Sequence, residues 1–366
     1  MLFCWEMGRT DRLFAPTWGG FLGLRGSSLR GNTDVSVIII NYNSAAFTRE
    51  CLRTIFENTR HSKVEVIVVD NASNDGCGEF ISVEFPEVIF VQSNRNLGFA
   101  GANNLGSTMA RGKYLLFLNP DTEIRGEAID ALCAFMDSMV DAGLAGAHLL
   151  NSDGSTQTTC ITAFPSIANQ VFGFEYLRKR TPRSRLWGMK ALFDNPGKPV
   201  TVDAISGACM LARREAFEQV MGFTTDYFMY GEDLDLCLKI TKAGWKVYYV
   251  PEAAVVHHGG QSSVTRAEDN YADVMIRHSM YRFMQLHRGR LTAVMFKIAT
   301  GVFAVGRMVV LFGFVPAAVI PSCRRFVLRG WRKWTTVFGW CLGLHNWVEQ
   351  QHTKTFVHDL TAPGTQ

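Results

Sequence analysis

Short apolar runs alternate with amphipathic segments from Val35 to about Leu149. Each run is short and nearly all apolar, as in parallel strands that are covered on both faces. The segments between the runs carry apolar residues at helical spacing. This alternation predicts right-handed βαβ units and an α/β fold with a doubly wound, mostly parallel sheet flanked by helices. The predicted strands are Val35–Ile40, Val64–Val69, Val88–Gln92, Tyr114–Leu118 and Leu144–His148, and the predicted helices are Phe47–Asn58, Phe99–Arg111 and Glu127–Met139.

The pattern changes after Leu150. The segment Asn151–Pro199 is rich in Thr, Arg, Pro and aromatic residues and has weak periodicity. A long irregular stretch inside a compact domain is usually functional or mobile. Further along, the pattern predicts two more strands and two more helices. They are a strand over Thr201–Leu211 interrupted at Gly207-Ala208, a helix over Glu232–Ala243 that ends at Gly244, a strand over Lys246–Val250 and a helix over Val264–His287.

The C-terminal part is more apolar and more basic. The stretch Ile298–Ile320 carries one charge, Arg307, and its length would suffice to cross a bilayer. Glycines and Pro316 interrupt it, and the segment after it mixes Arg and Lys with Trp and Phe, as interfacial helices on anionic lipid do. We expect surface docking or shallow insertion rather than a full span. A soluble helical subdomain with a basic face is the alternative.

Composition adds three limits. The chain has 366 residues, 47% of them hydrophobic and 19% charged, which fits a folded protein of one large domain with an appendage. A net charge of +4 gives no nucleic-acid signature, so no nucleic-acid partner is expected. The nine cysteines are scattered and form no C-x-x-C motif, which disfavours disulfide and zinc frameworks and indicates reduced thiols in the cytosol.

Polar side chains follow three of the predicted strands. Asn41 and Asn43 come after the first strand, Asp70 after the second, and Asn119-Pro120-Asp121 after the fourth. Ligands in open α/β sheets bind beyond the carboxyl ends of the strands. An acid placed there can hold a divalent metal against a diphosphate, because hard cations prefer carboxylate and phosphate oxygens. The alternative for Asn-Pro-Asp is ordinary turn chemistry.

Three further blocks carry candidate chemistry. Asn94–Asn104 joins a strand to a helix, and its Gly98 permits close backbone approach, although the block matches neither the Walker nor the dinucleotide fingerprint. Tyr230–Asp235 places three acids in the first turn of a helix, where they either complement the helix dipole or supply an ionised general base. His257-His258-Gly259-Gly260 follows an apolar strand, and a neutral imidazole there either joins a carboxylate on a metal or is structural.

In this order, these blocks resemble the family 2 inverting glycosyltransferases with the GT-A fold, and most of all the rhamnosyltransferase-like branch of bacterial polysaccharide biosynthesis. The resemblance covers about Val35 to His287. The Gln-x-x-Arg-Trp motif of the processive synthases is absent, which favours the addition of one sugar per encounter. The matching blocks are Val37–Ser44, Val68–Gly76, Asn94–Asn104, Leu118–Glu123, Ser206–Leu211, Tyr230–Asp235 and His257–Ser262.

The resemblance implies a role for each candidate residue. Asp121 and His257 are the implied ligands of a divalent metal, Mg²⁺ or Mn²⁺, and His257 is preferred to His258 because it has the family's His-x-Gly-Gly spacing. Asp233, in a Glu-Asp pair with Glu232, is the implied general base. The implied nucleotide-sugar-binding residues are Asn41, Asn43, Asp70, Asn96, Gly98 and Asn119, the last of which replaces the first acid of the usual Asp-x-Asp.

The implied function is transfer of one sugar with inversion from a nucleotide-diphosphate sugar, dTDP-rhamnose or a similar donor, to a lipid-linked or polysaccharide acceptor at the cytoplasmic face of the cell membrane. The alternatives are another sugar-nucleotide enzyme such as a nucleotidyltransferase, or a non-catalytic membrane-bound scaffold of the same fold. The predicted organisation is a poorly ordered leader or an upstream start-site artefact over residues 1–33, a GT-A domain over 34–290, a membrane-associated helical region over 291–350 and a tail over 351–366.

Overall fold

The structure is a computed structural model of the chain, and it describes residues 33–194, 197–259, 271–314 and 321–345. These residues belong to one compact unit, Asn32–Gln366. The predicted leader, apart from Thr33, and the predicted tail lie outside the described residues, and so does Val264–Asn270 of the helix expected over Val264–His287.

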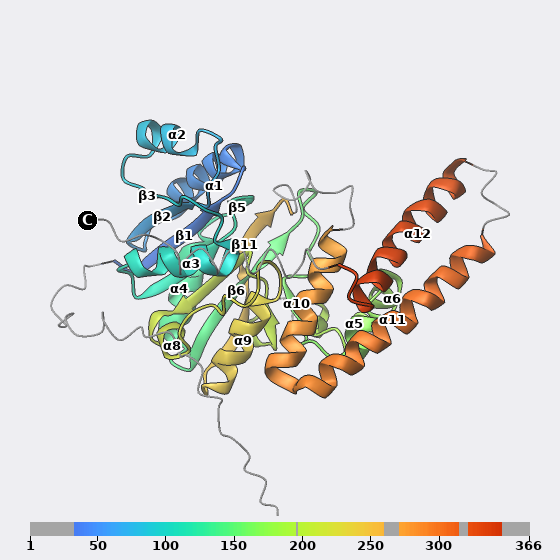
Figure 1. Ribbon diagram of the computed structural model, residues 1–366. Coiled ribbons are helices and arrows are strands. Elements are labelled where there is room, and N and C mark those ends of the chain that lie inside the picture. Colours follow the sequence, from blue (N-terminus) through green and yellow to red (C-terminus); the bar gives the residue numbers. More distant parts are fainter. Residues whose placement is uncertain (1–32, 195–196, 260–270, 315–320, 346–366) are drawn as a thin grey trace, which may run out of the picture. The chain divides into compact units, whose positions relative to one another are not determined.

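A nine-stranded sheet forms the centre of this unit (Figure 1). Its strands are β1 (Val35–Asn41), β2 (Val64–Asp70), β3 (Ile89–Gln92), β4 (Tyr114–Leu118), β5 (Thr122–Ile124), β6 (Ala142–Leu150), β8 (Val200–Thr201), β10 (Cys209–Arg213) and β11 (Lys246–His257). The strand order is β3-β2-β1-β4-β10-β6-β11-β5, and β8 pairs with β11. A second, two-stranded sheet pairs β7 (Ile161–Thr162) with β9 (Ala204–Ile205).

Most strands of the large sheet run in one direction, which confirms the predicted fold class. Strands β3, β2, β1 and β4 are parallel neighbours. Strand β10 lies antiparallel between β4 and β6, so that β6 again runs parallel to β4, and β11 is parallel to β6. The core strands are buried along their whole length, as the solid apolar runs predicted. The single strand expected over Thr201–Leu211 is wrong, because this segment contributes β8, β9 and the start of β10 to three different pairings.

Helices cover the sheet and continue beyond it. They are α1 (Ala45–Asn58), α2 (Cys77–Glu84), α3 (Gly98–Met109), α4 (Ala128–Ser138), α5 (Ile167–Phe172), α6 (Glu175–Arg180), α7 (Lys190–Asp194), α8 (Arg214–Gln219), α9 (Glu232–Lys242), α10 (Tyr271–Arg288), α11 (Arg290–Gly313) and α12 (Pro321–Cys341). Helix α1 buries one face against the sheet. The residues of this face, Cys51, Leu52 and Ile55, recur at helical spacing and are fully buried.

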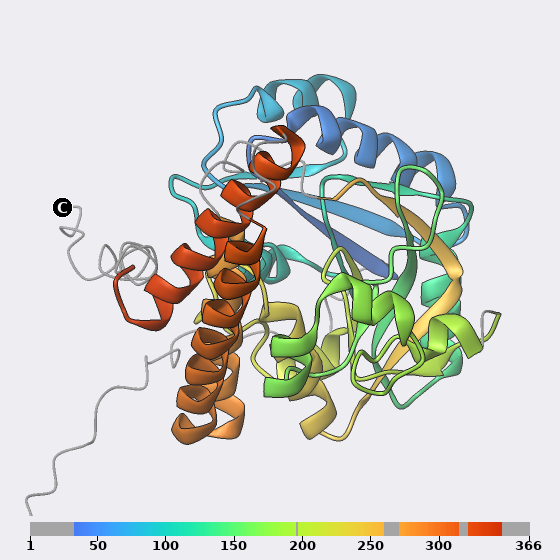
Figure 2. The ribbon, with the colours of Figure 1, turned by 90° about the vertical axis from the view of Figure 1, so that its right-hand side faces the viewer.

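The last three helices pack on one another rather than on the sheet. Helix α11 lies along both α10 and α12, as Figure 2 shows in orange and red. A second hydrophobic cluster fills the space between them, with Met275 and Met284 from α10, Phe296 from α11 and Trp340 from α12. By length and composition, α11 could cross a bilayer: its most apolar stretch has a mean hydropathy of 1.8, and 28% of that stretch is buried inside the structure.

Candidate active site

Asn41 and Asp70 lie side by side at the ends of β1 and β2. The parallel register pairs these two residues, and Asn41 Nδ2 donates to Asp70 Oδ2 at 2.7 Å. The other Asp70 oxygen accepts from the Ser73 amide and from Gln92 Nε2, both at 2.7 Å. Asn41 and Asp70 are both fully or nearly fully buried. Their bonds fix the loop that follows β2, and neither side chain projects into solvent.

Asn43 occupies a left-handed conformation at the same rim. Its φ is +52°, a region that Asn tolerates better than most residues. Its backbone N–H donates to Ser73 Oγ at 3.0 Å, and its side chain is exposed. Asn43 is therefore free to meet a ligand over the loop that Asn41 and Asp70 hold in place.

The sequence reasoning gave no separate role to Asn71, which joins two of the predicted blocks. Its Nδ2 donates to Asn96 Oδ1 at 3.0 Å, and its Oδ1 accepts from the Leu97 amide at 2.7 Å. Asn96 Oδ1 also accepts from the Gly98 amide at 2.8 Å. The Asx turn at Asn96 is therefore tied to the end of β2. In the sequence, this role is indicated by the position of Asn71 directly after Asp70 at the end of a strand.

Position 98 requires glycine because the backbone of Phe228 approaches it closely. The φ of Gly98 is +70°, and a Cβ there would lie 2.8 Å from the carbonyl oxygen of Phe228. Any other residue would be strained and would push Phe228 away. Since Phe228 leads directly into the acidic block Tyr230–Asp235, Gly98 positions that block against the loop before α3.

Asp121, Asn119 and His257 converge at the end of β4. Asp121 is 4% exposed. His257 Nε2 lies 3.4 Å from Asp121 Oδ1 and 3.3 Å from Asn119 Nδ2. His257 Nδ1 lies 2.8 Å from Gln157 Oε1, and Gln157 Nε2 in turn donates to Asn151 Oδ1 at 3.3 Å. This network assigns a proton to Nδ1, and in the Nδ1–H tautomer the Nε2 lone pair faces the Asp121 carboxylate.

Two electron-pair donors that face each other across 3.4 Å fit a divalent cation. A carboxylate oxygen and an imidazole nitrogen are both common ligands of Mn²⁺, and an outer hydrogen bond to Nδ1 is the usual support of such an imidazole. The donor set of Asp121 and His257 therefore fits the metal that the resemblance implies.

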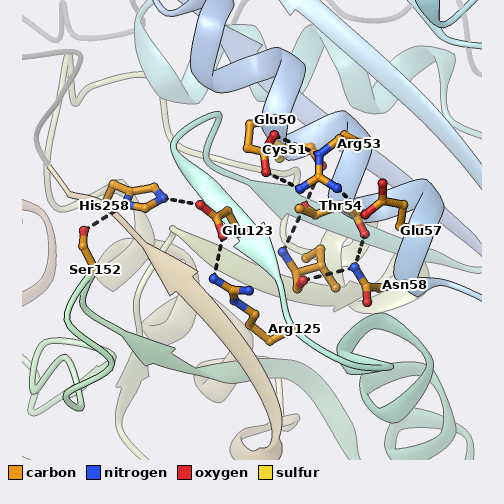
Figure 3. Close-up of polar contacts among 11 residues, drawn as sticks. Glu50, Cys51, Arg53, Thr54, Glu57, Asn58, Glu123, Arg125, Ser152 and His258 are labelled. Carbon is orange, nitrogen blue, oxygen red and sulfur yellow. Dashed lines mark hydrogen bonds and ion pairs between the residues drawn. The ribbon is translucent and has the colours of Figure 1, made fainter.

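His258 has a different set of partners (Figure 3). Its Nε2 lies 2.7 Å from Glu123 Oε1, and its Nδ1 lies 2.8 Å from Ser152 Oγ. Glu123 also pairs with Arg125 at 2.8 Å. Both ring nitrogens of His258 are therefore engaged away from Asp121, although its backbone N–H donates to the Asp121 carbonyl at 2.9 Å. The structure brings His257, and not His258, to the Asp121 carboxylate.

A second acidic group lies near the end of β2, but it does not resemble a metal site. Ligand atoms of Asp70, Asp75 and Cys77 approach within 4.8 Å of one another. Asn41 Nδ2 donates to both carboxylates, and burial raises the pKa of the Cys77 thiol to about 12. The group is therefore an amide held between two acids beside a neutral thiol.

Glu232 and Asp233 begin α9 and have different surroundings. Asp233 accepts from the backbone N–H of Gly207 at 3.1 Å and of Leu234 at 2.8 Å. Glu232 is 7% exposed, and its Oε2 atom has no hydrogen-bond partner in the described part of the chain. Burial, reinforced by the charge of Asp233, raises the pKa of Glu232 to about 8. Burial also raises the pKa of Asp233, but backbone N–H donors oppose that rise.

These environments separate the roles of the two acids. A proton shared by the pair resides on Glu232, whose Oε2 has no hydrogen-bond partner among the described residues, and Asp233, which accepts two backbone N–H bonds, carries the negative charge. Asp233 is also the less buried of the two. It is thus the carboxylate able to accept a proton.

The third acid of this block, Asp235, is structural. It is 1% exposed and accepts from Thr224 Oγ1 at 2.6 Å and from Tyr227 at 3.2 Å. His287 Nε2, near the end of α10, lies 2.6 Å from its Oδ1. Burial alone would raise the pKa of Asp235, but the hydrogen bonds from His287 and Thr224 and the charge of Lys239 hold it below its ordinary value. Asp235 therefore fastens α10 to the helix that carries Asp233, a role that sequence reasoning missed.

The dipeptide Gly207-Ala208 connects the two halves of the site. The Gly207 amide donates to Asp233, and the Ala208 carbonyl accepts from the Asn119 amide at 3.0 Å. A Cβ at Gly207 would lie 3.4 Å from that of Asp233. Because β10 pairs with β4 directly after this dipeptide, the candidate base and the candidate metal ligands lie on either side of it.

Comparisons with known proteins identify the family of this chain. A model described as glycosyl transferase family 2 matches residues 36–221, and one described as the N-terminal domain of galactosyltransferase matches residues 188–259. The second match contains Gly207, Asp233 and His257. The sheet, the site and these matches define a glycosyltransferase that uses a sugar nucleotide. The chain belongs to glycosyl transferase family 2, which confirms the resemblance found in the sequence.

Its relatives include rhamnosyltransferases. The chain is 31% identical over 247 residues to the N-acetylglucosaminyl-diphospho-decaprenol L-rhamnosyltransferase of Mycobacterium tuberculosis (strain ATCC 25618 / H37Rv), which covers 63% of this chain and 78% of that protein. It is 24% identical over 237 residues to rhamnosyltransferase WbbL of Escherichia coli (strain K12), over 61% and 83% of the two chains. The solved mannosyltransferase PcManGT of Pyrobaculum calidifontis is 18% identical with a TM-score of 0.49, over 84% of this chain and 86% of that one.

Proposed function

We propose that this chain transfers one sugar, rhamnose or a similar deoxyhexose or hexose, from a nucleotide-diphosphate donor to a lipid-linked or polysaccharide acceptor with inversion at the anomeric carbon. The observation that carries the proposal is the arrangement around Gly207-Ala208, with Asp233 on one side and Asn119, Asp121 and His257 on the other. Relatives named as rhamnosyltransferases support the choice of donor.

The proposed reaction is a single displacement. Asp233 accepts the proton of an acceptor hydroxyl, and that oxygen forms a bond to the anomeric carbon while the bond from this carbon to the diphosphate oxygen breaks. The nucleoside diphosphate leaves on the opposite face, so the configuration inverts and no enzyme nucleophile is needed. A divalent cation on Asp121 and His257 would supply charge stabilisation for the leaving diphosphate.

The donor is proposed to lie along the carboxyl ends of β1, β2 and β4. Asn43 and the loop held by Asp70 and Asn41 would face the nucleoside, and Asn96 with Gly98 would lie against the sugar. Asn119 would contact the diphosphate beside Asp121. The division of the chain into a catalytic domain over 34–290 and a helical region over 291–350 stays a prediction.

Attachment to the cytoplasmic face of the membrane is proposed for α11 and α12. The outward face of α11 is apolar, with Ile298, Val302 and Val309 each more than 60% exposed. The neighbouring helix α12 carries four exposed basic residues: Arg324, Arg325, Arg329 and Arg332. This combination favours an anionic lipid surface.

A donor panel tests the proposed function. Purified full-length protein is incubated with dTDP-rhamnose and with UDP- and GDP-hexoses, with and without Mg²⁺ or Mn²⁺, and release of nucleoside diphosphate is measured. Metal-dependent release from one donor is expected, and it rises when a lipid-linked saccharide is added. A parallel reaction with added pyrophosphate tests the alternative, because a nucleotidyltransferase would convert the nucleotide sugar and pyrophosphate into nucleoside triphosphate and sugar 1-phosphate. A scaffold would form no product in either reaction.

A further inference from the structure

Three cationic side chains from three different helices lie around a group of three aromatic rings, those of Phe174, Phe303 and Trp334. The cations are Arg277 of α10, Arg307 of α11 and Lys333 of α12. The Arg307 guanidinium carbon lies 4.9 Å from the ring centroids of both Phe174 and Phe303. The same carbon of Arg307 lies 5.8 Å from the ring centroid of Trp334. The guanidinium carbon of Arg277 lies 5.4 Å from this centroid, and Lys333 Nζ lies 5.8 Å from it. We call the three cations the cationic cluster.

The cationic cluster keeps an excess of positive charge. Asp273 accepts from Lys333 at 2.6 Å and from Arg277 at 3.4 Å. Among the described residues no carboxylate pairs with Arg307, and the neighbouring Glu175 pairs with Lys179. Three cations and one carboxylate leave a net charge of +2. Burial lowers the pKa of Arg277 despite the opposing effect of Asp273, so an anion at this position would stabilise its charge.

Helix α10 carries one member of the cationic cluster and also contacts the segment that leads into α9. Arg277 lies one helical turn before Met280 on α10, a rise of about 5 Å. A Cβ at Gly231, which caps the helix carrying Asp233, would lie 3.0 Å from Met280 Cε. Ser279 Oγ also donates to the Met229 carbonyl at 2.8 Å. Helix α10 therefore links the cluster to the segment that positions the candidate base.

An apolar surface extends from the cluster in the other direction. On the Arg307 side of α11, Val310 lies one turn after Arg307 and is 57% exposed, and Phe314 lies two turns after it and is 51% exposed. A ligand with a diphosphate and a long hydrocarbon chain could place its charge among the three cations and its chain along Val310 and Phe314. Guanidinium groups suit this role because they donate paired hydrogen bonds to phosphate oxygens.

We propose that the cationic cluster binds the diphosphate of a lipid-linked acceptor. The net charge of +2 matches the two negative charges of a diphosphate that joins a lipid to a sugar. The donor's diphosphate is assigned to Asp121 and His257, so the two diphosphates occupy separate sites. This inference rests on the proposed function in one respect, the lipid-linked nature of the acceptor.

Vesicle flotation tests the inference without requiring catalysis. Full-length protein is mixed with phosphatidylcholine vesicles that contain either a polyprenyl diphosphate or phosphatidylglycerol, adjusted to the same surface charge. The wild-type protein is expected to bind the diphosphate vesicles more tightly. Arg307→Gln should lose that preference, with roughly tenfold weaker binding, as for one charge-assisted hydrogen-bonded pair. Lys333→Gln should reduce it in the same direction.

Arg324→Gln is the matched control, because it removes one exposed charge of α12 outside the cluster. It should weaken binding to both kinds of vesicle equally. Equal binding of the wild type to both vesicles, or loss of the preference in Arg324→Gln as well, overturns the inference and assigns the cluster to anionic lipid in general. Thermal melting of each variant excludes unfolding as the cause. Absence of sugar transfer with intact vesicle preference would contradict the proposed function alone.

Discussion

His257 Nε2 lies 3.4 Å from Asp121 Oδ1, and Gln157 engages the other nitrogen of the same ring. The adjacent His258 instead contacts Glu123 and Ser152. Two neighbouring histidines are thus directed to different partners, because β11 pairs with β5 so that His257 lies opposite Thr122, next to Asp121 in the chain. This relationship separates a candidate metal ligand from a histidine that fastens a strand end.

The first prediction concerns metal dependence. Loss of an outer hydrogen-bond partner of a metal ligand typically weakens metal binding by ~10–100-fold, and we expect Gln157→Leu to weaken metal-dependent donor binding by this amount. Asp121→Ala and His257→Ala each remove a candidate ligand and should weaken it further. Titration of Mn²⁺ against nucleotide release measures the effect. His258→Ala is the matched control and should keep the wild-type metal response. An unchanged metal response in Asp121→Ala would remove this residue from the site.

The second prediction separates Asp233 from Glu232. Asp233→Asn keeps the shape but cannot accept a proton, so turnover should fall by ~10²–10⁴-fold while donor affinity changes little. Glu232→Gln replaces a carboxyl that is already neutral, so turnover should stay within the same order of magnitude. Single-turnover transfer and donor titration measure the two quantities separately. The opposite ranking of the two variants would assign the base to Glu232.

The third prediction concerns pH and stability. The pKa of Glu232 is raised to about 8 in the folded protein from an ordinary value of 4.5. Between these two pH values, the folded state keeps a proton on Glu232 that the unfolded state has released. This contribution to the free energy of unfolding is complete below pH 4.5 and is lost as the pH rises through about 8. It amounts to at most about 5 kcal/mol.

Urea unfolding at several pH values measures this effect. Glu232→Gln should flatten the decline of stability over this pH range, because the amide does not titrate. Asp235, whose lowered pKa acts in the opposite sense toward acid pH, is present in both proteins and serves as the internal reference. Parallel pH profiles for the wild type and Glu232→Gln would contradict the assignment.

The fourth prediction concerns the membrane. Val302 and Val309 are 68% and 67% exposed on the outward face of α11. Replacing both with Ser should remove roughly 1.5–3 kcal/mol of apolar burial each if this face inserts into lipid. The full-length protein should then leave the membrane pellet in high salt, whereas the wild type stays and needs detergent. Arg324→Gln with Arg329→Gln should instead weaken attachment only at low salt, where exposed charges are less screened.

Several of these features could be predicted from the sequence because they depend on local patterns. The runs that form β1, β2 and β4 are continuous and apolar, so burial of these strands on both faces and the polar residues at their ends could be read directly. The acids at the start of α9 and the histidines at the end of β11 were found in the same way. The resemblance then supplied roles for Asp121, Asp233 and His257 that no local pattern contains.

The remaining features depend on contacts between distant segments. Strand β10 inserts between β4 and β6, and this insertion brings Gly207-Ala208 between Asp233 and Asn119. The pairing joins segments that are far apart in the chain, and a two-residue periodicity carries no information about which strands pair. The tie between Asn71 and Asn96, the pair of Asp235 with His287 and the gathering of Arg277, Arg307 and Lys333 have the same origin. The sequence alone determined which side chains stand at strand ends and helix starts, because short-range sterics and burial act within one element. Only the tertiary structure decided which of those side chains meet, because their hydrogen bonds and charges become effective once packing has excluded water and fixed the register.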